Sequence, residues 1–330
     1  MTRTQTKIAA LSLVVFTGYV FAQSEIVTAG YSIPPPAMYA APGQVVTLFV
    51  RGITAKDAVA QSFPLPTILS GLSVAVKVLC CNPQTYPSAL PIFKIHSEDS
   101  CDGRGFLPCP LTQVTIQIPT EPLCSPNGFP NSCMIVPGAF SLTVNTSGDQ
   151  GSSGTTAAST FPVVISGFHA HFLNNCDTVL GGSGICSQLI THADGTPVTS
   201  GNFAKPGETI VLYAVGLGFG DPSVPTGTAA KSPAYANPGL SFSMLVSFRE
   251  DLPPASPAPP LTYLPAGKYF EPDFVGVVPG YAGLYQINFT VPQPPTQAHH
   301  CAGGFADTNT RIAFSFSTTN EYVDVCVLIP

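Results

Sequence analysis

Apolar and polar residues alternate in short runs along most of this 330-residue chain, and turn-forming residues separate the runs. The clearest runs are residues 44–51, 208–215, 140–144, 161–165 and 312–316. Alternation with a period of two is typical of β-strands with one buried face, and no window has the periodicity of a helix longer than two or three turns. The pattern therefore predicts an all-β fold built from antiparallel β-sandwiches.

A repeated motif organises the chain. Residues 41–53 read APGQVVTLFVRGI and residues 205–217 read KPGETIVLYAVGL, so each has a Pro-Gly turn, a strand-like run, and then Gly with an aliphatic residue. Further along, residues 115–119 (TIQIP) correspond to residues 286–292 (QINFTVP). The Pro-Gly turn and the closing Pro are 77 residues apart in one copy and 86 in the other. Similar order at similar spacing predicts a duplicated domain.

The first 22 residues have the pattern of an export signal. Arg3 and Lys7 form a basic start, an apolar run extends from Ile8 to Val20, and Ala22 provides a small residue near the expected cleavage point. The run of about 13 residues is too short to span a bilayer comfortably. We therefore expect a secreted or cell-surface protein with no transmembrane segment in the mature chain.

The remaining chain is expected to form two domains. Residues 146–160 are small and polar, which suits either a flexible linker or a long hairpin loop. We favour the loop, because the strand-like residues 161–165 that follow would complete the first copy of the repeat. This gives an N-terminal β-sandwich domain over residues 23–165 and a C-terminal one over residues 166–330.

Ten cysteines fall into a group of six and a group of four, and even numbers favour disulfides in an oxidising compartment. Each favoured pair closes a short segment rich in turn residues. These pairs are Cys176–Cys186, Cys301–Cys326 and Cys124–Cys133. Cys80 and Cys81 are expected to bond separate partners among Cys101 and Cys109, and the sequence leaves the connectivity within residues 80–133 open.

Charge is scarce, which excludes several classes of function. Charged residues make up 9% of the chain, with 12 basic and 18 acidic residues and no basic cluster, whereas an average soluble domain has about 25%. A nucleic-acid partner is therefore not expected. The chain has no nucleophile-elbow, zinc-protease or phosphate-loop motif. We expect no enzymatic activity and no cofactor.

Two sets of side chains are candidates for binding. His169 and His171 would lie on one face of a strand, and a metal site would require them to converge with His299 and His300. Nothing in the sequence indicates convergence, so we interpret these histidines as surface loop residues and predict no metal.

The chain has 21 Phe and 11 Tyr but no Trp. Tyr235, Tyr263 and Tyr269, in the loop-rich residues 221–272, are candidate carbohydrate contacts, although aromatic residues of this kind also serve as core residues.

The second half also resembles a known family. Residues 194–196, 202–208, 211–218 and 278–292 are similar to the C-terminal domain family found in many copies in Solibacter and other Acidobacteria, which is itself similar to immunoglobulin-like IPT/TIG sandwiches. The resemblance covers roughly residues 165–330, and the first half resembles the segment that commonly precedes this domain. It implies two tandem immunoglobulin-like sandwiches outside the cytoplasm, and no catalytic residues, because the family has no established activity.

These observations predict a secreted, non-enzymatic tandem β-sandwich protein for cell-surface binding, adhesion or extracellular structure. Its partner would be an extracellular protein, a glycan or a second copy of the chain. Residues 24–39 could lie outside the domain core as an arm that donates a strand to a neighbouring subunit. The alternative function is a carbohydrate-binding or accessory module of an extracellular degradative system.

Overall fold

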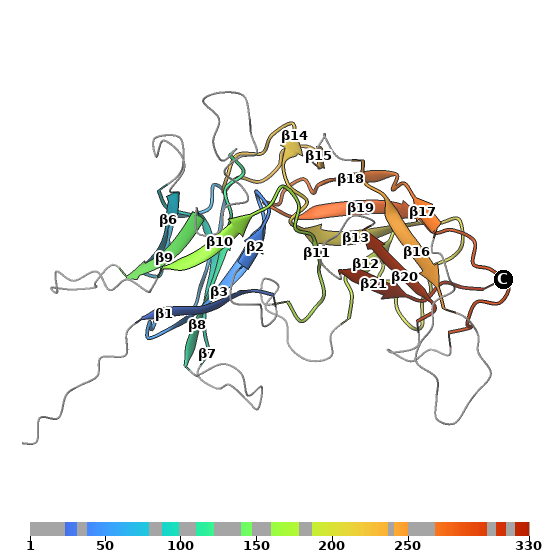
Figure 1. The fold of residues 1–330 in the computed structure, drawn as a ribbon, viewed down its shortest axis with the longest axis horizontal. Coiled ribbons are helices and arrows are strands. Elements are labelled where there is room, and N and C mark those ends of the chain that lie inside the picture. The colour runs from blue at the N-terminus through green and yellow to red at the C-terminus, as the bar shows by residue number, and fades with distance from the viewer. Residues whose placement is uncertain are drawn as a thin grey trace, which may run out of the picture.

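All regular structure is β in the part of the chain that the computed structural model describes (Figure 1). The described residues are 24–31, 38–78, 88–98, 110–121, 140–146, 160–177, 187–236, 241–249, 268–301, 308–314 and 321–329. They contain no helix, and their strands form two pairs of sheets. The predicted all-β sandwich class is confirmed, and the predicted export signal lies outside the described residues.

The N-terminal sheet pair contains ten strands, shown in blue to green in Figure 1. One sheet has the order β1 (Glu25–Gly30), β3 (Val45–Arg51), β8 (Leu111–Gln117), β7 (Ile92–Glu98), β4 (Ala58–Val59). The other has the order β2 (Met38–Ala40), β10 (Phe161–Ile165), β9 (Phe140–Thr146), β6 (Leu72–Val78), β5 (Ile68–Leu69). Inward-facing aliphatic residues such as Leu48, Ile116 and Leu142 fill the space between the sheets and are fully buried.

The C-terminal sheet pair follows a similar plan, in yellow to red in Figure 1. In its larger sheet, β11 (His171–Phe172) and β12 (Ile190–His192) both pair with β13 (Thr209–Val215), followed by β19 (Tyr285–Thr290), β18 (Phe274–Val277), β15 (Ala234–Ala236), β14 (Gly220–Asp221). Its smaller sheet has the order β17 (Lys268–Phe270), β16 (Met244–Phe248), β20 (Thr310–Phe314), β21 (Tyr322–Val325). Phe172 and Phe314 stack across the core with ring centroids 4.9 Å apart.

The two Pro-Gly turns of the repeat have the same hydrogen bonds. We call residues 41–44 the first turn and residues 205–208 the second turn. The amide of Gly43 donates to Ile118 at 3.0 Å, and the amide of Gly207 donates to Val291 at 2.8 Å. Both glycines have positive φ angles, 75° and 83°, which glycine adopts without steric cost. Each turn then leads into a strand, β3 or β13, that pairs antiparallel with β8 or β19.

The pairing of β9 with β10 bears on the polar segment between them. Phe161 lies opposite Leu142 in an antiparallel ladder, so the intervening residues connect neighbouring strands of one sheet. This supports the loop interpretation over the linker, although residues 147–159 lie outside the described part. The division into two domains near residue 165 stays a prediction.

The expectation of an exposed N-terminal arm is wrong. β1 pairs antiparallel with β3, and β2 pairs with β10 in the one parallel ladder among the named strands of the described residues. Ile26, Ala29 and Met38 are buried in the core of the N-terminal sheet pair. In the described parts of this segment, β1 and β2 are therefore paired and buried within their own chain and do not form a free arm.

Backbone contacts join the two sheet pairs. The Gly227 carbonyl accepts from the Leu65 amide at 2.7 Å, and the Gly227 amide donates to the Gln117 side chain at 2.7 Å. A Cβ on Gly216 would overlap the His169 carbonyl and come within 2.9 Å of Gln44 Cδ, in the first turn. A Cβ on Gly207, in the second turn, would meet nothing within 4 Å. The first turn is buried between the sheet pairs, whereas the second faces solvent.

The different surroundings of Gly207 and Gly216 predict unequal effects of two glycine substitutions. Gly207→Ala should lower the free energy of unfolding by about 1 kcal/mol, because alanine is strained at positive φ. Gly216→Ala carries the same strain (φ 78°), and its Cβ also collides with the His169 carbonyl and presses on the Gln44 side chain, so it should cost at least about 2 kcal/mol more. Urea unfolding of both variants would measure this, and equal losses would contradict the packing of Gly216 at the contact.

Candidate functional site

A cluster of polar side chains lies where the two sheet pairs meet. The rings of Tyr31 and His171 stack in parallel, with centroids 4.0 Å apart and planes 4° from parallel. His171 Nε2 lies 3.0 Å from Asp177 Oδ2, and His171 Nδ1 lies 3.1 Å from Glu321 Oε1. We call these four residues the junction cluster. Tyr31 comes from the N-terminal sheet pair and the other three from the C-terminal part of the chain.

The local structure fixes each carboxylate of the junction cluster. Asp177 accepts hydrogen bonds from the Asn174 amide at 2.8 Å and from the Asn174 side chain at 3.0 Å. Glu321, which immediately precedes β21, accepts a hydrogen bond from the Phe172 backbone amide at 3.3 Å. Because both carboxylates are held by hydrogen bonds, His171 meets them in a defined orientation.

Tyr31 is equally fixed on the opposite side of the cluster. It directly follows β1, and its hydroxyl donates to the Val45 carbonyl. Gln44 Nε2 lies 3.4 Å from the same hydroxyl, so the first turn also holds the ring in place. Burial is the main reason that the pKa of Tyr31 is raised well above 10, and this phenol stays neutral at physiological pH.

The electrostatics of the junction cluster make His171 a cation. Burial lowers the pKa of His171, but hydrogen bonds to Asp177 and Glu321 and the attraction of both charges outweigh this effect and raise the pKa to about 9. Burial lowers the pKa of His169, two residues away. An imidazolium on the face of Tyr31 is also a favourable cation–π arrangement. Both nitrogens of His171 are engaged within the C-terminal part, and its ring stack on Tyr31 is the contact that the cluster makes between the sheet pairs.

The interpretation of the histidines as surface loop residues is wrong for His171, whose side chain is 13% exposed. His169 and His171 lie at the contact between sheet pairs, whereas His299 and His300 lie beside the disulfide cysteine Cys301. Within the described ranges, no three or more His, Cys, Asp or Glu side chains are grouped so that they could hold a metal ion. No sequence signal links His171 to Glu321, which is 150 residues away.

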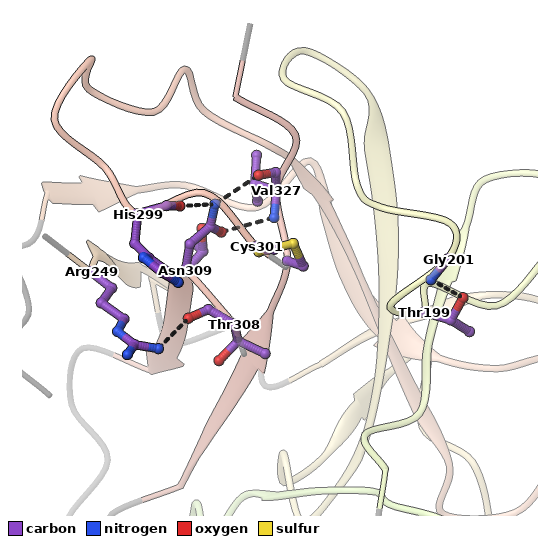
Figure 2. The surroundings of a disulfide bond; sticks show 10 residues. Thr199, Gly201, Arg249, His299, Cys301, Thr308, Asn309 and Val327 are labelled. Carbon is purple, nitrogen blue, oxygen red and sulfur yellow. Dashed lines mark hydrogen bonds between the residues drawn. A yellow bond between two sulfur atoms is a disulfide. The ribbon is translucent and has the colours of Figure 1, made fainter. Parts of the chain in front are cut away.

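The disulfide Cys301–Cys326 joins positions 25 residues apart, as the sequence favours (Figure 2). Beside it, the fully buried Asn309 donates to the carbonyls of His299 and Val327 and accepts from the Val327 amide at 2.9 Å. The disulfide and the hydrogen bonds of the Asn309 side chain together hold the last strand-like residues of the chain against the core.

The other predicted cysteine pairs lie wholly or partly outside the described residues. Cys176 is disulfide-bonded, but its expected partner Cys186 lies outside the described residues. Cys124 and Cys133 lie outside them too, as do the remaining cysteines of residues 80–133. These pairings stay predictions.

A second candidate site lies on the outer face of the larger C-terminal sheet. Tyr235 in β15 is 64% exposed, and its ring lies 5.3 Å from that of Phe274 in β18. On the neighbouring strand β19, Gln286 Nε2 donates to Asn288 Oδ1 at 3.1 Å. We call these four residues the aromatic–amide face.

The predicted tyrosine contacts do not form one surface. Tyr269 is 66% exposed but lies in β17, in the other sheet of the pair, and Tyr263 lies outside the described residues. Sequence reasoning identified Tyr235 but missed Phe274, Gln286 and Asn288. Only the strand register brings these residues together.

No protein-family model matches this chain, and no curated protein is detectably similar to it. The described residues include no helix with the length and apolar character needed to cross a membrane.

The junction cluster predicts a particular pH dependence. Because the pKa of His171 rises on folding from about 6.5 to about 9, its contribution is complete below pH 6.5 and is lost as the pH rises to 9. The stability advantage of the natural protein over a His171→Gln variant should shrink by about 3 kcal/mol across this range. Urea unfolding at both pH values would measure it.

A matched control is His96→Gln, since His96 is exposed and pairs with Asp57 away from the junction cluster. This variant should keep the pH dependence of the natural protein. An NMR titration that places the pKa of His171 at or below 6.5 would contradict the geometry of the cluster.

The disulfide gives a third prediction. Replacing both Cys301 and Cys326 with Ser opens a 25-residue loop in the unfolded chain and should reduce stability by about 3 kcal/mol. Urea unfolding without reductant would measure the loss. Non-reducing peptide mapping of the natural protein should recover the two cysteines in one linked peptide, and recovery of either one as a free thiol would refute the pairing.

Proposed function

We propose that this protein is a secreted, non-enzymatic binding protein of the cell surface, in which two packed sandwich units present their outer faces to a partner. The observation that carries the proposal is the junction cluster. Its ionisable groups are engaged with one another, and the stack of His171 on Tyr31 joins the sheet pairs. A chain that uses these groups for cohesion keeps its outer sheet faces in a fixed relative orientation, as an adhesive or structural protein requires.

The remaining chemistry of the described residues supports a binding role over a catalytic one. A pocket of about 270 Å³ opens beside β4, and its lining includes Phe63, Phe93 and Lys94. Lys94 is the only ionisable residue of this lining, whereas acid–base catalysis usually needs two groups with separated pKa values. Two of the most exposed large side chains, Tyr235 and Tyr269, instead lie on strand faces.

Three further features favour a location outside the cytoplasm. The disulfide Cys301–Cys326 would persist in an oxidising compartment. Residues 1–22 have the pattern of an export signal, and the resemblance of residues 165–330 to the acidobacterial domain family fits the same location. These features support secretion and an immunoglobulin-like architecture.

Protease treatment of intact source cells tests the proposal. The protein should be found in the medium or be cleaved on the intact cells, while a cytoplasmic marker stays whole. A variant without residues 2–22 is the control and should remain protected inside. Recovery of the natural protein in the cytoplasm, protected until lysis, would overturn the proposal.

A further inference from the structure

We propose that the aromatic–amide face binds neutral polysaccharide, with one pyranose ring stacked on Tyr235 and Phe274 and its hydroxyls bonded to Gln286 and Asn288. The inference rests on the proposed function as a binding protein. It specifies the surface and the chemical class of the partner.

The strand register places these side chains in two adjacent rows. Residues directly opposite in an antiparallel ladder project from the same face of a sheet. One row crosses four strands through Asp221, Tyr235, Gly276 and Gln286. The next row contains Phe274 opposite Asn288.

This face is directed away from the core. Val275, Val277 and Ile287 alternate with the row residues along β18 and β19, and all three are buried in the core of the C-terminal sheet pair. Tyr235 and Asp221 are exposed, and Phe274, Gln286 and Asn288 are half-buried. The rows therefore form a shallow outer surface and not a cavity.

Gly276 allows the aromatic surface to form. A Cβ at this position would overlap the ring of Phe274 and come within 2.9 Å of its Cε1 atom, so the ring lies over the Gly276 backbone. The Tyr235 ring adjoins it at 54°. Two adjoining rings on a sheet face offer the apolar contact that the C–H groups of a sugar ring need.

The two amides supply the polar half of the site. The hydrogen bond between Gln286 and Asn288 fixes both side chains and leaves the Gln286 carbonyl and the Asn288 amino group without a hydrogen-bond partner among the described residues. A donor and an acceptor beside an aromatic surface match a polyhydroxylated ring. Asp221, at the edge of the first row, can accept a hydrogen bond from a further sugar hydroxyl.

The charges favour a neutral ligand over an anionic one. No Lys or Arg belongs to either row, and Asp221 is their only charged member. Without Arg3 and Lys7 of the predicted export signal, ten basic residues face 18 acidic ones, a net charge of −8. An acidic polysaccharide would be repelled.

The test uses the full chain, expressed for export so that its disulfides form. Binding is measured by calorimetry against cellohexaose, xylohexaose, mannohexaose, laminarihexaose and chitohexaose, with hexagalacturonate as the anionic probe. At least one neutral oligosaccharide should bind. Tyr235→Ala should weaken that binding at least about tenfold, as expected for an aromatic anchor, and Gln286→Ala should also weaken it.

Tyr269→Ala is the matched control, because Tyr269 is equally exposed but lies in the other sheet. Its affinity should stay within about twofold of that of the natural protein. The far-ultraviolet circular dichroism spectrum of each variant checks that it is folded. The proposal is overturned if none of the neutral probes binds, if hexagalacturonate binds best, or if Tyr269→Ala removes binding while Tyr235→Ala does not. A surface protein that binds no sugar would refute only this inference, whereas a cytoplasmic location would refute the proposed function.

Discussion

The imidazolium of His171, held between Asp177 and Glu321 and stacked on Tyr31, is the interaction on which the arrangement of the sheet pairs depends. The buried Asp177 carboxylate would be costly without a cation, and this histidine supplies a positive charge that Asp177 shares with the partly exposed Glu321. Its stacking partner Tyr31 comes from the opposite sheet pair, so the charged ring completes its contacts only when the pairs are packed. The ring stack thereby links the charged cluster of the C-terminal part to the N-terminal sheet pair.

The internal repeat shows how one motif serves two purposes. Both Pro-Gly turns have the same backbone bonds, yet the first is buried and the second faces solvent. The sequences differ accordingly. Ala41 and Gln44 in the first turn correspond to Lys205 and Glu208 in the second, and charged residues are almost never fully buried unless paired. The charge difference between the two turns therefore indicates that the first turn is the buried one. It does not indicate that the C-terminal sheet pair is what buries it.

The sequence was sufficient for the features that depend on local pattern. Strands 45–51 and 209–215, the turns before them and the Cys301–Cys326 pairing all follow from alternation, turn residues and short separation along the chain. The junction cluster could not be predicted, because His171 and Glu321 are 150 residues apart and meet only through packing. Of the four residues in the aromatic–amide face, the sequence indicated only Tyr235. The pairing register between strands places Gln286 in the same row as Tyr235, and that register could not be predicted from the sequence.

The central claim is that a charged His171 couples the two sheet pairs through Tyr31. A double-mutant cycle of Tyr31→Leu and His171→Gln, measured by urea unfolding at pH 6 and pH 10, tests it most directly. The account predicts a coupling free energy of about 1–2 kcal/mol at pH 6 that falls towards zero at pH 10 as the imidazolium loses its proton. Additive effects of the two substitutions at pH 6 would contradict it.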